Sequence, residues 1–408
     1  MKKITVPFCL VLLFGIALSQ PRHFLFTRGK EIIGTDGKPF YMKGTNLGNW
    51  LVPEGYMFKF RQATSPRLIQ ETLYELVGPG KANIFWKKYL DSYITRDDIH
   101  YMRSIGMNSI RIPFHYKLFT DEDYLGGRGA ARGFALMDRV IGWCRQEGLY
   151  VILDMHCAPG GQTGDNIDDS WGTPFLFENP VNTQLTINTW KLIAAHYRNE
   201  TTIMGYDLLN EPIATYFDSS RYNHYLEPLY KVITAAIRTV DANHLVFLGG
   251  AQWDGNFRIF GKPFDSKVVY TFHKYWMPPK LEEIKAYTDF RDRYHVPVYC
   301  GETGENTDEW IRQFRELLEQ QHIGWHFWPY KKMDNTRGIL TFAIPMHYDE
   351  IRQFADTTRS SFELIRKLIP TDETTIHQAL DGFLENCLFK NCRQNAGYIK
   401  GLGLEVKK

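Results

Sequence analysis

The sequence of 408 residues predicts an α/β fold, specifically a (β/α)8 barrel preceded by a β-hairpin. Eight short apolar runs alternate with longer stretches of helical periodicity, which is the pattern of parallel βαβ units. Most of the apolar runs end in a polar side chain capable of chemistry. The structural alternative is a doubly wound open sheet, which needs fewer strands, and no GxGxxG motif follows the first run.

The N-terminal residues, 1–19, predict a cleavable export signal. Two lysines precede an apolar run at 6–18, and the small residues Ala17 and Ser19 suit cleavage before Gln20. The run is shorter than the roughly 20 residues that span a bilayer. We therefore expect a secreted or periplasmic protein with no stable membrane insertion.

Residues 20–408 predict a single catalytic barrel domain that includes a C-terminal helix and tail. Turn residues at Arg28-Gly29 and Asp36-Gly37 predict a hairpin over Phe24–Phe40. The eight expected barrel strands are Phe40–Leu47, Ser109–Phe114, Tyr150–His156, Ile203–Glu211, Leu245–Gly250, Val268–Tyr275, Pro297–Thr303 and Gly324–Lys331. The expected helices include Ala135–Glu147, Thr183–Arg198, Asn223–Val240, Leu281–Tyr294 and Thr307–Gln320, with a last helix near Ser361–Leu368 and a tail from residue 371.

Composition excludes some classes of partner. With 48 Lys and Arg against 46 Asp and Glu, the net charge is +2, and no strong field would attract nucleic acid or an anionic membrane. Aromatic residues make up 15% of the chain, which suits a large core and also platforms for sugar rings. We expect a monomer.

The cysteines predict neither a metal site nor a full disulfide framework. Five follow the signal, an odd number, and no CxxC pair occurs. Cys387 and Cys392 are close enough in sequence to close a small loop, whereas Cys144, Cys157 and Cys300 lie in apolar segments that predict buried thiols. No metal or organic cofactor is expected.

Polar residues end most of the apolar runs, and in a (β/α)8 barrel the carboxyl ends of the strands hold the active site. Three long segments, 48–100, 157–183 and 331–350, follow strands on that same face and are expected as loops that shape a substrate groove. The polar strand-end residues are Asn46, Arg111, His156, Asn210, Glu211, His273, Tyr275, Glu302 and Trp328.

Glu211 and Glu302 are the candidate catalytic pair. Glycoside hydrolysis needs one protonated carboxyl to assist the leaving oxygen and one ionised carboxylate to attack the anomeric carbon. Each glutamate follows an apolar run, in IMGYDLLNEP and PVYCGETG. We predict Glu211 as acid/base and Glu302 as nucleophile, with the separation of about 5–5.5 Å that retention of configuration requires.

Neighbouring residues suit the two roles. Arg111 and Tyr275 are expected to keep Glu302 ionised by hydrogen bonding. Asn210 is expected to contact a sugar 2-hydroxyl, and His156 and His273 to bind hydroxyls or tune the acid.

Further residues are candidates for binding or for support. Trp328 is expected to stack under the reacting sugar, and Glu54 to bind hydroxyls at the non-reducing end. Asp154 is expected to orient its neighbours, while Asp168 and Asp169 are expected mainly to fix their loop.

The segments GTNLGNWLVPE, SIRIPF, VILDMHCAPGGQ, DLLNEP, FHKY, CGETG and FWPYKK occur in this order over about residues 40–350. Together they resemble glycoside hydrolase family 5, the cellulase-like retaining barrels. The resemblance implies a functional set of Arg111, His156, Asn210, Glu211, His273, Tyr275, Glu302 and Trp328.

The opening segment and DMHCAPGGQ look most similar to the exo-β-1,3-glucanase branch, which implies that Glu54 binds the terminal glucose. The branch's GEWS is replaced here by GETGEN, its double histidine by FHKYW, and the loop GGQTGDNIDDSWGTPF also departs from it. These departures leave the linkage open among β-1,3-glucan, β-1,4-glucan, another β-glucan and a glycoside with a non-sugar aglycone.

The sequence therefore favours a secreted retaining β-glycoside hydrolase acting on a β-glucan or a related β-linked oligo- or polysaccharide. A transglycosylase would share every residue named, and a barrel that binds carbohydrate without cleaving it is a third possibility. A metal-dependent barrel hydrolase is disfavoured because His156 and His273 lack a matched set of acidic ligands.

Overall fold

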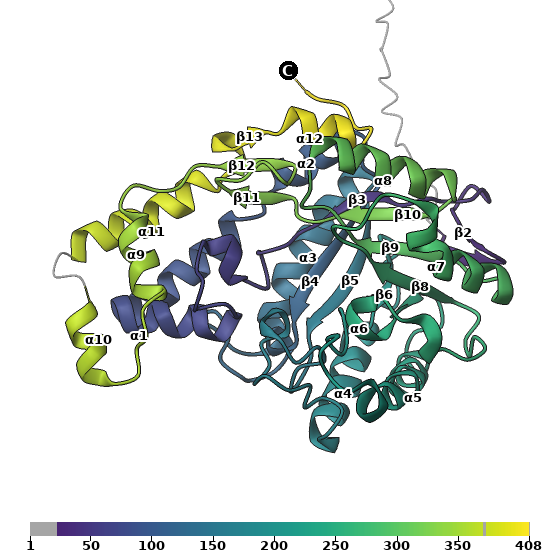
Figure 1. The fold of residues 1–408 in the computed structure, drawn as a ribbon, viewed down its shortest axis with the longest axis horizontal. Coiled ribbons are helices and arrows are strands. Elements are labelled where there is room, and N and C mark those ends of the chain that lie inside the picture. The colour runs from purple at the N-terminus through teal and green to yellow at the C-terminus, as the bar shows by residue number, and fades with distance from the viewer. Residues whose placement is uncertain (1–22, 370–372, 408) are drawn as a thin grey trace, which may run out of the picture.

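A closed parallel barrel of eight strands forms the centre of the molecule (Figure 1). The computed structural model describes residues 23–369 and 373–407, so the predicted export signal lies outside the described residues. Neighbouring strands follow the order β10-β3-β4-β5-β6-β7-β8-β9, and β10 closes on β3 with Trp325 beside Lys43. The predicted (β/α)8 barrel is confirmed. Among the described residues we find no helix with the length and hydropathy to cross a bilayer.

Each of the eight predicted apolar runs contains one barrel strand. The strands are β3 (Lys43–Asn46), β4 (Ser109–His115), β5 (Tyr150–Cys157), β6 (Ile203–Asp207), β7 (Leu245–Gly249), β8 (Val268–His273), β9 (Val298–Glu302) and β10 (Gly324–Phe327). Most are buried along their whole length, as expected where helices cover the outside of a parallel barrel. Several expected strand ends were wrong: β6 ends at Asp207, β8 at His273 and β10 at Phe327. Asn210, Glu211, Tyr275 and Trp328 therefore lie in the loops beyond these strands, and Arg111 is the third residue of β4 rather than its end.

The five predicted helices are confirmed. Four of them start one to five residues away from the predicted first residue. The helices around the barrel are α2 (Arg96–Ser104), α3 (Ala130–Glu147), α4 (Pro180–Tyr197), α5 (Ser219–Arg238), α7 (Leu281–Tyr294) and α8 (Asp308–Gln320). After β7 the chain forms only the short α6 (Ala251–Asp254) and the 3-10 turn η4 (Phe257–Ile259). Three more 3-10 turns follow strands: η1 (Gly55–Phe58), η2 (Tyr116–Phe119) and η3 (Asn166–Asp168).

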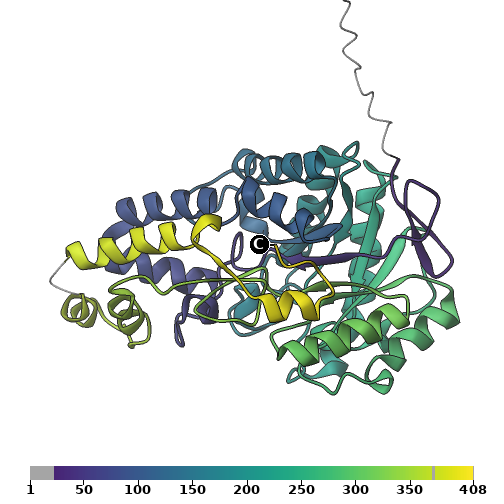
Figure 2. The same ribbon diagram turned by 90° about the horizontal axis from the view of Figure 1, so that it is seen from above.

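A layer of helices lies beside the barrel, on the left of Figure 1 and again beside it in Figure 2. It contains α1 (Pro66–Ser92), α9 (Tyr348–Ala355), α10 (Phe362–Leu368) and α11 (Glu373–Asn386). The expectation of a loop over 48–100 was therefore wrong for much of that segment. The sequence GPG interrupts its helical pattern, but Gly78 adopts a left-handed φ of 77° and lets the helix resume at a kink before Pro79.

The C-terminal tail returns to the barrel as a small sheet and a helix. Its elements are β11 (Lys331–Met333), β12 (Leu340–Phe342), the 3-10 turn η5 (Phe389–Asn391), β13 (Arg393–Gln394) and α12 (Ala396–Gly401). At the other end of the chain, β1 (Phe26–Arg28) pairs with β2 (Glu31–Ile33), which confirms the predicted hairpin.

The five described cysteines are free thiols. Cys144, Cys157 and Cys300 are buried, as predicted. Cys387 and Cys392 form no disulfide; instead their sulfur atoms lie 3.4 and 3.3 Å from the carbonyl oxygens of Leu384 and Leu388 at the end of α11.

A buried ion pair joins the segment after β10 to α2, and its lysine also bonds to the C-terminal tail. The Nζ of Lys331 lies 2.8 Å from Asp98 Oδ1 and donates to the carbonyl oxygens of Tyr93 and Cys387, each at 2.8 Å. Both charged side chains are fully buried. Asp98 also accepts from the backbone N–H of Thr95 at the start of α2, so one carboxylate fixes a helix end and a lysine together.

Replacing Lys331 with Met should therefore lower the free energy of unfolding by about 3–5 kcal/mol, because it leaves Asp98 buried and unpaired. Urea denaturation measures the loss. The double variant Lys331→Met/Asp98→Asn should recover part of it, and Lys407→Met, at an exposed site, is the control. A loss below about 1 kcal/mol would contradict a buried pair.

Candidate active site

A cavity of about 560 Å³ opens at the carboxyl ends of the barrel strands. Seven of the nine residues predicted for the site line it, and the other two, Arg111 and Asn210, are fully buried and bonded to the lining carboxylate Glu302 or to each other. The lining residues predicted from the sequence are Glu54, His156, Glu211, His273, Tyr275, Glu302 and Trp328. The fold thus brings the whole predicted set together.

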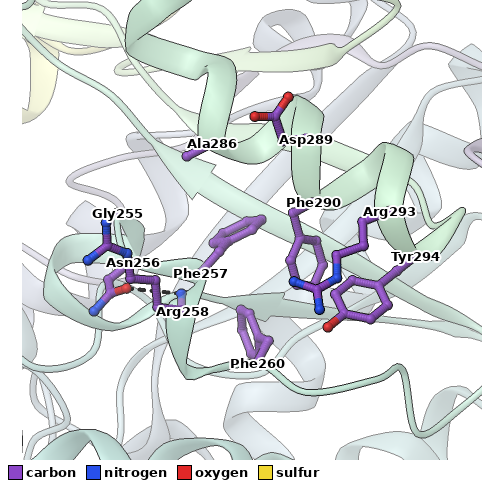
Figure 3. A pocket seen from close by; sticks show the side chains of 10 residues that line it. All are labelled: Gly255, Asn256, Phe257, Arg258, Phe260, Ala286, Asp289, Phe290, Arg293 and Tyr294. Carbon is purple, nitrogen blue, oxygen red and sulfur yellow. Dashed lines mark hydrogen bonds between the residues drawn. The ribbon is translucent and has the colours of Figure 1, made fainter.

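A second hollow of about 680 Å³ lies between η4 and α7 (Figure 3). Its lining is mainly Phe257, Phe260, Phe290 and Tyr294, with two arginines. The one carboxylate in that lining, Asp289, is paired with Lys285 at 2.6 Å. It therefore lacks the two carboxyl groups that glycoside hydrolysis needs.

Arg111, on β4, is the buried centre of the site. Its Nη1 donates to Glu302 Oε1 at 2.5 Å and to Asn46 Oδ1 at 3.1 Å, and its Nε donates to Asp207 Oδ2 at 2.9 Å. Its Nη2 donates to Asn210 Oδ1 at 2.9 Å and lies 3.1 Å from Asp154 Oδ1. One guanidinium group thus orients partners from β3, β5, β6 and β9 and from the loop after β6.

Glu302, the last residue of β9, accepts hydrogen bonds from two neighbours. In addition to Arg111, the hydroxyl of Tyr275 donates to its Oε2 at 3.1 Å, as the sequence predicted. Burial raises the pKa of Glu302, while His273 and Arg111 oppose the rise. The two donors, one of them the cationic guanidinium, favour the charged form against the effect of burial.

Glu211 has a different environment. It stands in the loop after β6 with a left-handed φ of 46°, and its Oε1 lies 2.9 Å from His273 Nδ1. Burial raises its pKa to about 7. One oxygen of Glu211 and one of Glu302 lie within 4.8 Å of each other, and the two carboxyls have different partners: a guanidinium and a phenol for Glu302, an imidazole for Glu211.

The loop after β5 braces the backbone that carries Glu211. Thr163 Oγ1 donates to the carbonyl oxygen of Glu211, and Gln162 Nε2 donates to that of Asn210, both at 2.8 Å. Asp168 in turn accepts from the backbone N–H groups of Thr163 and Gly164. Asp169 lies 3.3 Å from His115 Nε2 and accepts from the backbone N–H of Arg67, so both aspartates act within the loop and its surroundings, as expected.

His156 and Trp328 form one wall of the cavity. Their rings are parallel within 6° at a centroid distance of 5.6 Å. Asp154 Oδ2 lies 2.8 Å from His156 Nδ1 and orients that ring, as predicted for Asp154. Burial lowers the pKa of His156 to about 4, so the imidazole is neutral near pH 7 and can exchange hydrogen bonds with sugar hydroxyls.

Glu54 is buried at the cavity wall, with its Oε1 lacking a hydrogen-bond partner in the described chain. Burial, followed by the charges of Glu302 and Glu305, raises its pKa well above the usual range. Beside it, Glu305 pairs with Lys332, and Tyr56 Oη accepts from Trp328 Nε1 at 2.7 Å. These atoms provide a polar wall with free capacity for a hydroxylated ligand.

Sequence reasoning missed several polar residues of the site: Asp207, Asp254, Glu305, Tyr56 and Lys332. Asp207 is the first residue of DLLNEP and ends β6, so the strand-end rule could have found it. Asp254 lies in a left-handed turn that has no strand or helix signal. Glu305 lies in GETGEN, whose departure from the exo-β-1,3-glucanase branch was the available signal, and Lys332 lies in the matching segment FWPYKK.

Two sets of side chains have donor atoms close enough to hold a cation. They are Asp154, His156 and Glu302, and Glu211, His273 and Glu302, with donor atoms within 4.8 Å in each set. Glu302 belongs to both sets and is already bonded to the Arg111 cation, which would repel a metal ion at this position. The hydrogen bonds described above account for the clustering.

A sequence model described as Cellulase (glycosyl hydrolase family 5) matches residues 74–334, about two thirds of the chain. The chain belongs to glycosyl hydrolase family 5. The family predicted from the seven segments is thereby confirmed, and so is its consequence that the protein is a glycosidase.

Similar proteins of the family differ in the activity that their names state. A beta-xylosidase of Phanerodontia chrysosporium is 34% identical over 62% of this chain, and this chain spans about half (52%) of its length. Endoglucanase C of Acetivibrio thermocellus is 26% identical over 62% of this chain and 88% of its own. A probable glucan 1,3-beta-glucosidase A of Aspergillus clavatus is 29% identical over 52% of each chain, which is consistent with the likeness to the exo-β-1,3-glucanase branch.

A solved structure supports the fold. The rutinosidase from Aspergillus niger superposes with a TM-score of 0.57 at 20% identity, over 73% of this chain and 92% of its own. At this identity the likeness concerns the barrel and not the substrate.

The hydrogen bond from Tyr275 to Glu302 predicts a measurable change. In Tyr275→Phe the ionised carboxylate loses a donor, so the pKa of Glu302 should rise and the acid limb of the kcat/KM profile should move to higher pH. A hydrogen bond to a charged group contributes about 1.5–3 kcal/mol, so kcat/KM should fall about tenfold or more.

The matched control is Tyr270→Phe, which removes a buried hydroxyl that has no partner in the described chain. Its profile should stay that of the wild type. An unchanged acid limb in Tyr275→Phe would show that the hydroxyl does not stabilise the anion.

Proposed function

We propose that the protein is a secreted, retaining β-glycoside hydrolase in which Glu302 is the nucleophile and Glu211 the acid/base. The observation that carries the proposal is the proximity of two carboxyl groups whose oxygens lie within 4.8 Å of each other: Glu302 accepts from Arg111 and Tyr275, and Glu211 lies against His273. This proximity suits the roughly 5–5.5 Å of a retaining pair rather than the roughly 6.5–9.5 Å of an inverting pair, so it favours direct attack by a carboxylate.

In the first step an oxygen of Glu302 attacks the anomeric carbon and the bond to the leaving oxygen breaks. Glu211 gives its proton to that oxygen, so the aglycone leaves as an alcohol and Glu302 carries a glycosyl ester. In the second step Glu211, now ionised, takes a proton from water, whose oxygen attacks the anomeric carbon. The ester bond breaks and Glu302 returns as a carboxylate bonded to Arg111.

The substrate we propose is a β-glucan or a related β-linked oligo- or polysaccharide. The names of the similar proteins support this class, and the cavity supplies aromatic and polar walls of the kind that sugar rings need. Trp328 would stack on the reacting sugar, and Glu54 would bind hydroxyls beyond it. Trp253, whose Nε1 donates to Thr215 in the loop after Glu211, would contact the leaving group because the proton is delivered on that side.

The pH dependence of kcat/KM follows from the two environments. The reaction needs Glu302 ionised and Glu211 protonated, so activity should rise as Glu302 loses its proton and fall as Glu211 does, with an alkaline limb near pH 7. Because the carboxyls interact, the two limbs belong to the pair. Initial rates on an aryl β-glycoside from pH 4 to pH 9 measure the profile, and constant activity up to pH 9 would contradict Glu211 as the acid.

Variants of the two glutamates separate their roles. Glu302→Gln should reduce turnover by a factor on the order of 10⁴ or more, because no ester can form. Glu211→Ala should lose about 10²–10⁴-fold on substrates with poor leaving groups, retain activity on those with good leaving groups, and gain rate with azide. Glu309→Gln, on the exposed face of α8, is the control.

A screen of defined β-linked oligosaccharides with product mapping would identify the linkage and the endo or exo mode. The anomer formed first, observed by NMR, reports retention, and a high acceptor concentration reveals transglycosylation. Binding without any turnover across the screen would favour a carbohydrate-binding barrel. Export predicts that protein recovered from the medium or periplasm starts at Gln20.

A further inference from the structure

The turn after β7 has an unusual backbone. Three successive residues, Gln252, Trp253 and Asp254, have left-handed φ values of 53°, 61° and 58°. Residues other than glycine rarely adopt this conformation even singly, and such strain persists only where the surrounding structure enforces it. An observed run of three at the edge of the catalytic cavity therefore points to a functional purpose.

Side-chain amides hold this turn in place. Gln252 and Asn223 exchange two amide hydrogen bonds, at 3.1 and 2.7 Å, and Asn256 Nδ2 donates to Gln252 Oε1 at 2.8 Å. Asn256 Oδ1 in turn accepts from the backbone N–H of Arg258, the bond drawn in Figure 3. Gly249 makes room for the result, because a Cβ there would lie 1.9 Å from Asp254 Oδ1.

The turn places the carboxyl group of Asp254 beside the ring of His273 and the backbone of Glu211. Its Oδ2 lies 3.3 Å from His273 Nε2 and accepts from the backbone N–H of Glu211 at 3.3 Å. The other ring nitrogen of His273, Nδ1, lies 2.9 Å from Glu211 Oε1. Asp254, His273 and Glu211 thus form a chain of contacts that ends at the proposed proton donor; the contact at Nε2 rests on distance, and Nε2 has no hydrogen-bond partner among the described residues.

The protons of this chain can be assigned from the partners of each atom. Asp254 is fully buried, and its Oδ1 has no hydrogen-bond partner within the described residues. The hydroxyl of Thr271 also has no hydrogen-bond partner among these residues; Thr271 lies on β8 beside Gly249 of β7. A buried carboxylate with an unpartnered oxygen is costly, whereas a neutral carboxylic acid tolerates this position. Burial and the charges of Asp207 and Glu211 raise the pKa of Asp254 well above its usual range, which also favours the neutral acid.

We propose that Asp254 is a positioning residue that is protonated and donates to His273 Nε2, which fixes the ring proton on Nδ1. His273 then donates to Glu211 Oε1 throughout the cycle, to the carbonyl oxygen of the acid form and to the carboxylate of the base form. Glu211 Oε2 stays free to exchange its proton with the leaving oxygen and with water. No proton leaves Asp254 during turnover. The inference rests on Glu211 being the acid/base.

The opposite assignment, an ionised Asp254 accepting from Nε2–H, places a lone pair of Nδ1 against Glu211. It would require the Glu211 proton to point at His273 and away from the substrate. The two assignments place the ring proton of His273 on different nitrogens, Nδ1 in the proposal and Nε2 in the alternative, and NMR distinguishes them.

The first experiment is Asp254→Leu, assayed on a poor and on a good leaving group. The variant removes the donor to Nε2, so kcat/KM should fall about 10–100-fold on the poor leaving group and much less on the good one. An unchanged kcat/KM on the poor leaving group, with folding intact by circular dichroism, would overturn the proposal.

The second experiment needs no variant at Asp254. Nitrogen-15 NMR of protein labelled at its 13 histidines, with His273 identified by its absence in His273→Gln, reports which ring nitrogen carries the proton. Protonation at Nδ1 is expected, and protonation at Nε2 alone would overturn the assignment. If Asp254 is correctly placed but Glu211 is not the acid/base, the NMR result stands while the leaving-group dependence of Asp254→Leu disappears, so the two failures are distinguishable.

A matched control exists in a second buried Asp–His pair. Asp241 Oδ2 lies 2.5 Å from His244 Nδ1, far from the cavity, and hydrogen bonding to His244, together with its charge, helps lower the pKa of Asp241 to about 2 despite burial. Asp241→Asn should reduce the free energy of unfolding and leave kcat/KM unchanged. The pH profile of Asp254→Leu also depends on the other charged and titratable groups near Glu211, which are His273, His156, Arg111, Glu302 and Asp165.

Discussion

The buried guanidinium of Arg111 is the interaction on which the site depends. It lies on β4 inside the barrel and bonds to Asn46, Asp207, Asn210 and Glu302, which come from three other strands and one loop. A planar group with five N–H donors in fixed directions can hold several acceptors at once, and its charge cannot be neutralised near pH 7. The barrel thereby fixes the nucleophile relative to the loop that carries the acid.

One cation cannot neutralise all the carboxyl groups around it, and this shortage divides their roles. Burial raises the pKa of Asp154 and Asp207 to about 7 and that of Asp254 well above its usual range, although Arg111 opposes each rise. Glu302 has the shortest bond to the guanidinium, whereas Glu211 faces His273, whose pKa burial lowers to about 3. In the mechanism that we propose, the same chemical group therefore serves as nucleophile in one position and as acid in the other.

Much of this arrangement could be predicted from the sequence because each barrel strand is marked by a short apolar run. Apolar runs of five to eight residues that contain or end near Arg111, His156 or Glu302 predicted the barrel, its active face and the candidate catalytic pair. The exact positions of residues outside regular structure could not be predicted. Glu211 stands four residues beyond β6, and Asp254 is positioned by a left-handed turn that amide side chains enforce, for which no local pattern exists. The helix α1 was missed because Gly78 and Pro79 look like a break in sequence and act as a kink in space.

Several residues with a left-handed backbone lie near the proposed catalytic residues. Glu211, Ile213, Trp253, Asp254 and Trp276 all have positive φ, and all lie in loops that follow β6, β7 and β8 at the cavity. Each costs about 1–3 kcal/mol, against a total stability of about 5–15 kcal/mol for a typical protein, so several together need strong support. The eight-stranded barrel and the loop after β5 provide it, through bonds from Gln162 and Thr163 to the backbone of Asn210 and Glu211. A closed barrel with a large buried core can offset strain that an open sheet edge could not. This explains why the acid/base can stand on a loop and still keep the geometry that proton transfer requires.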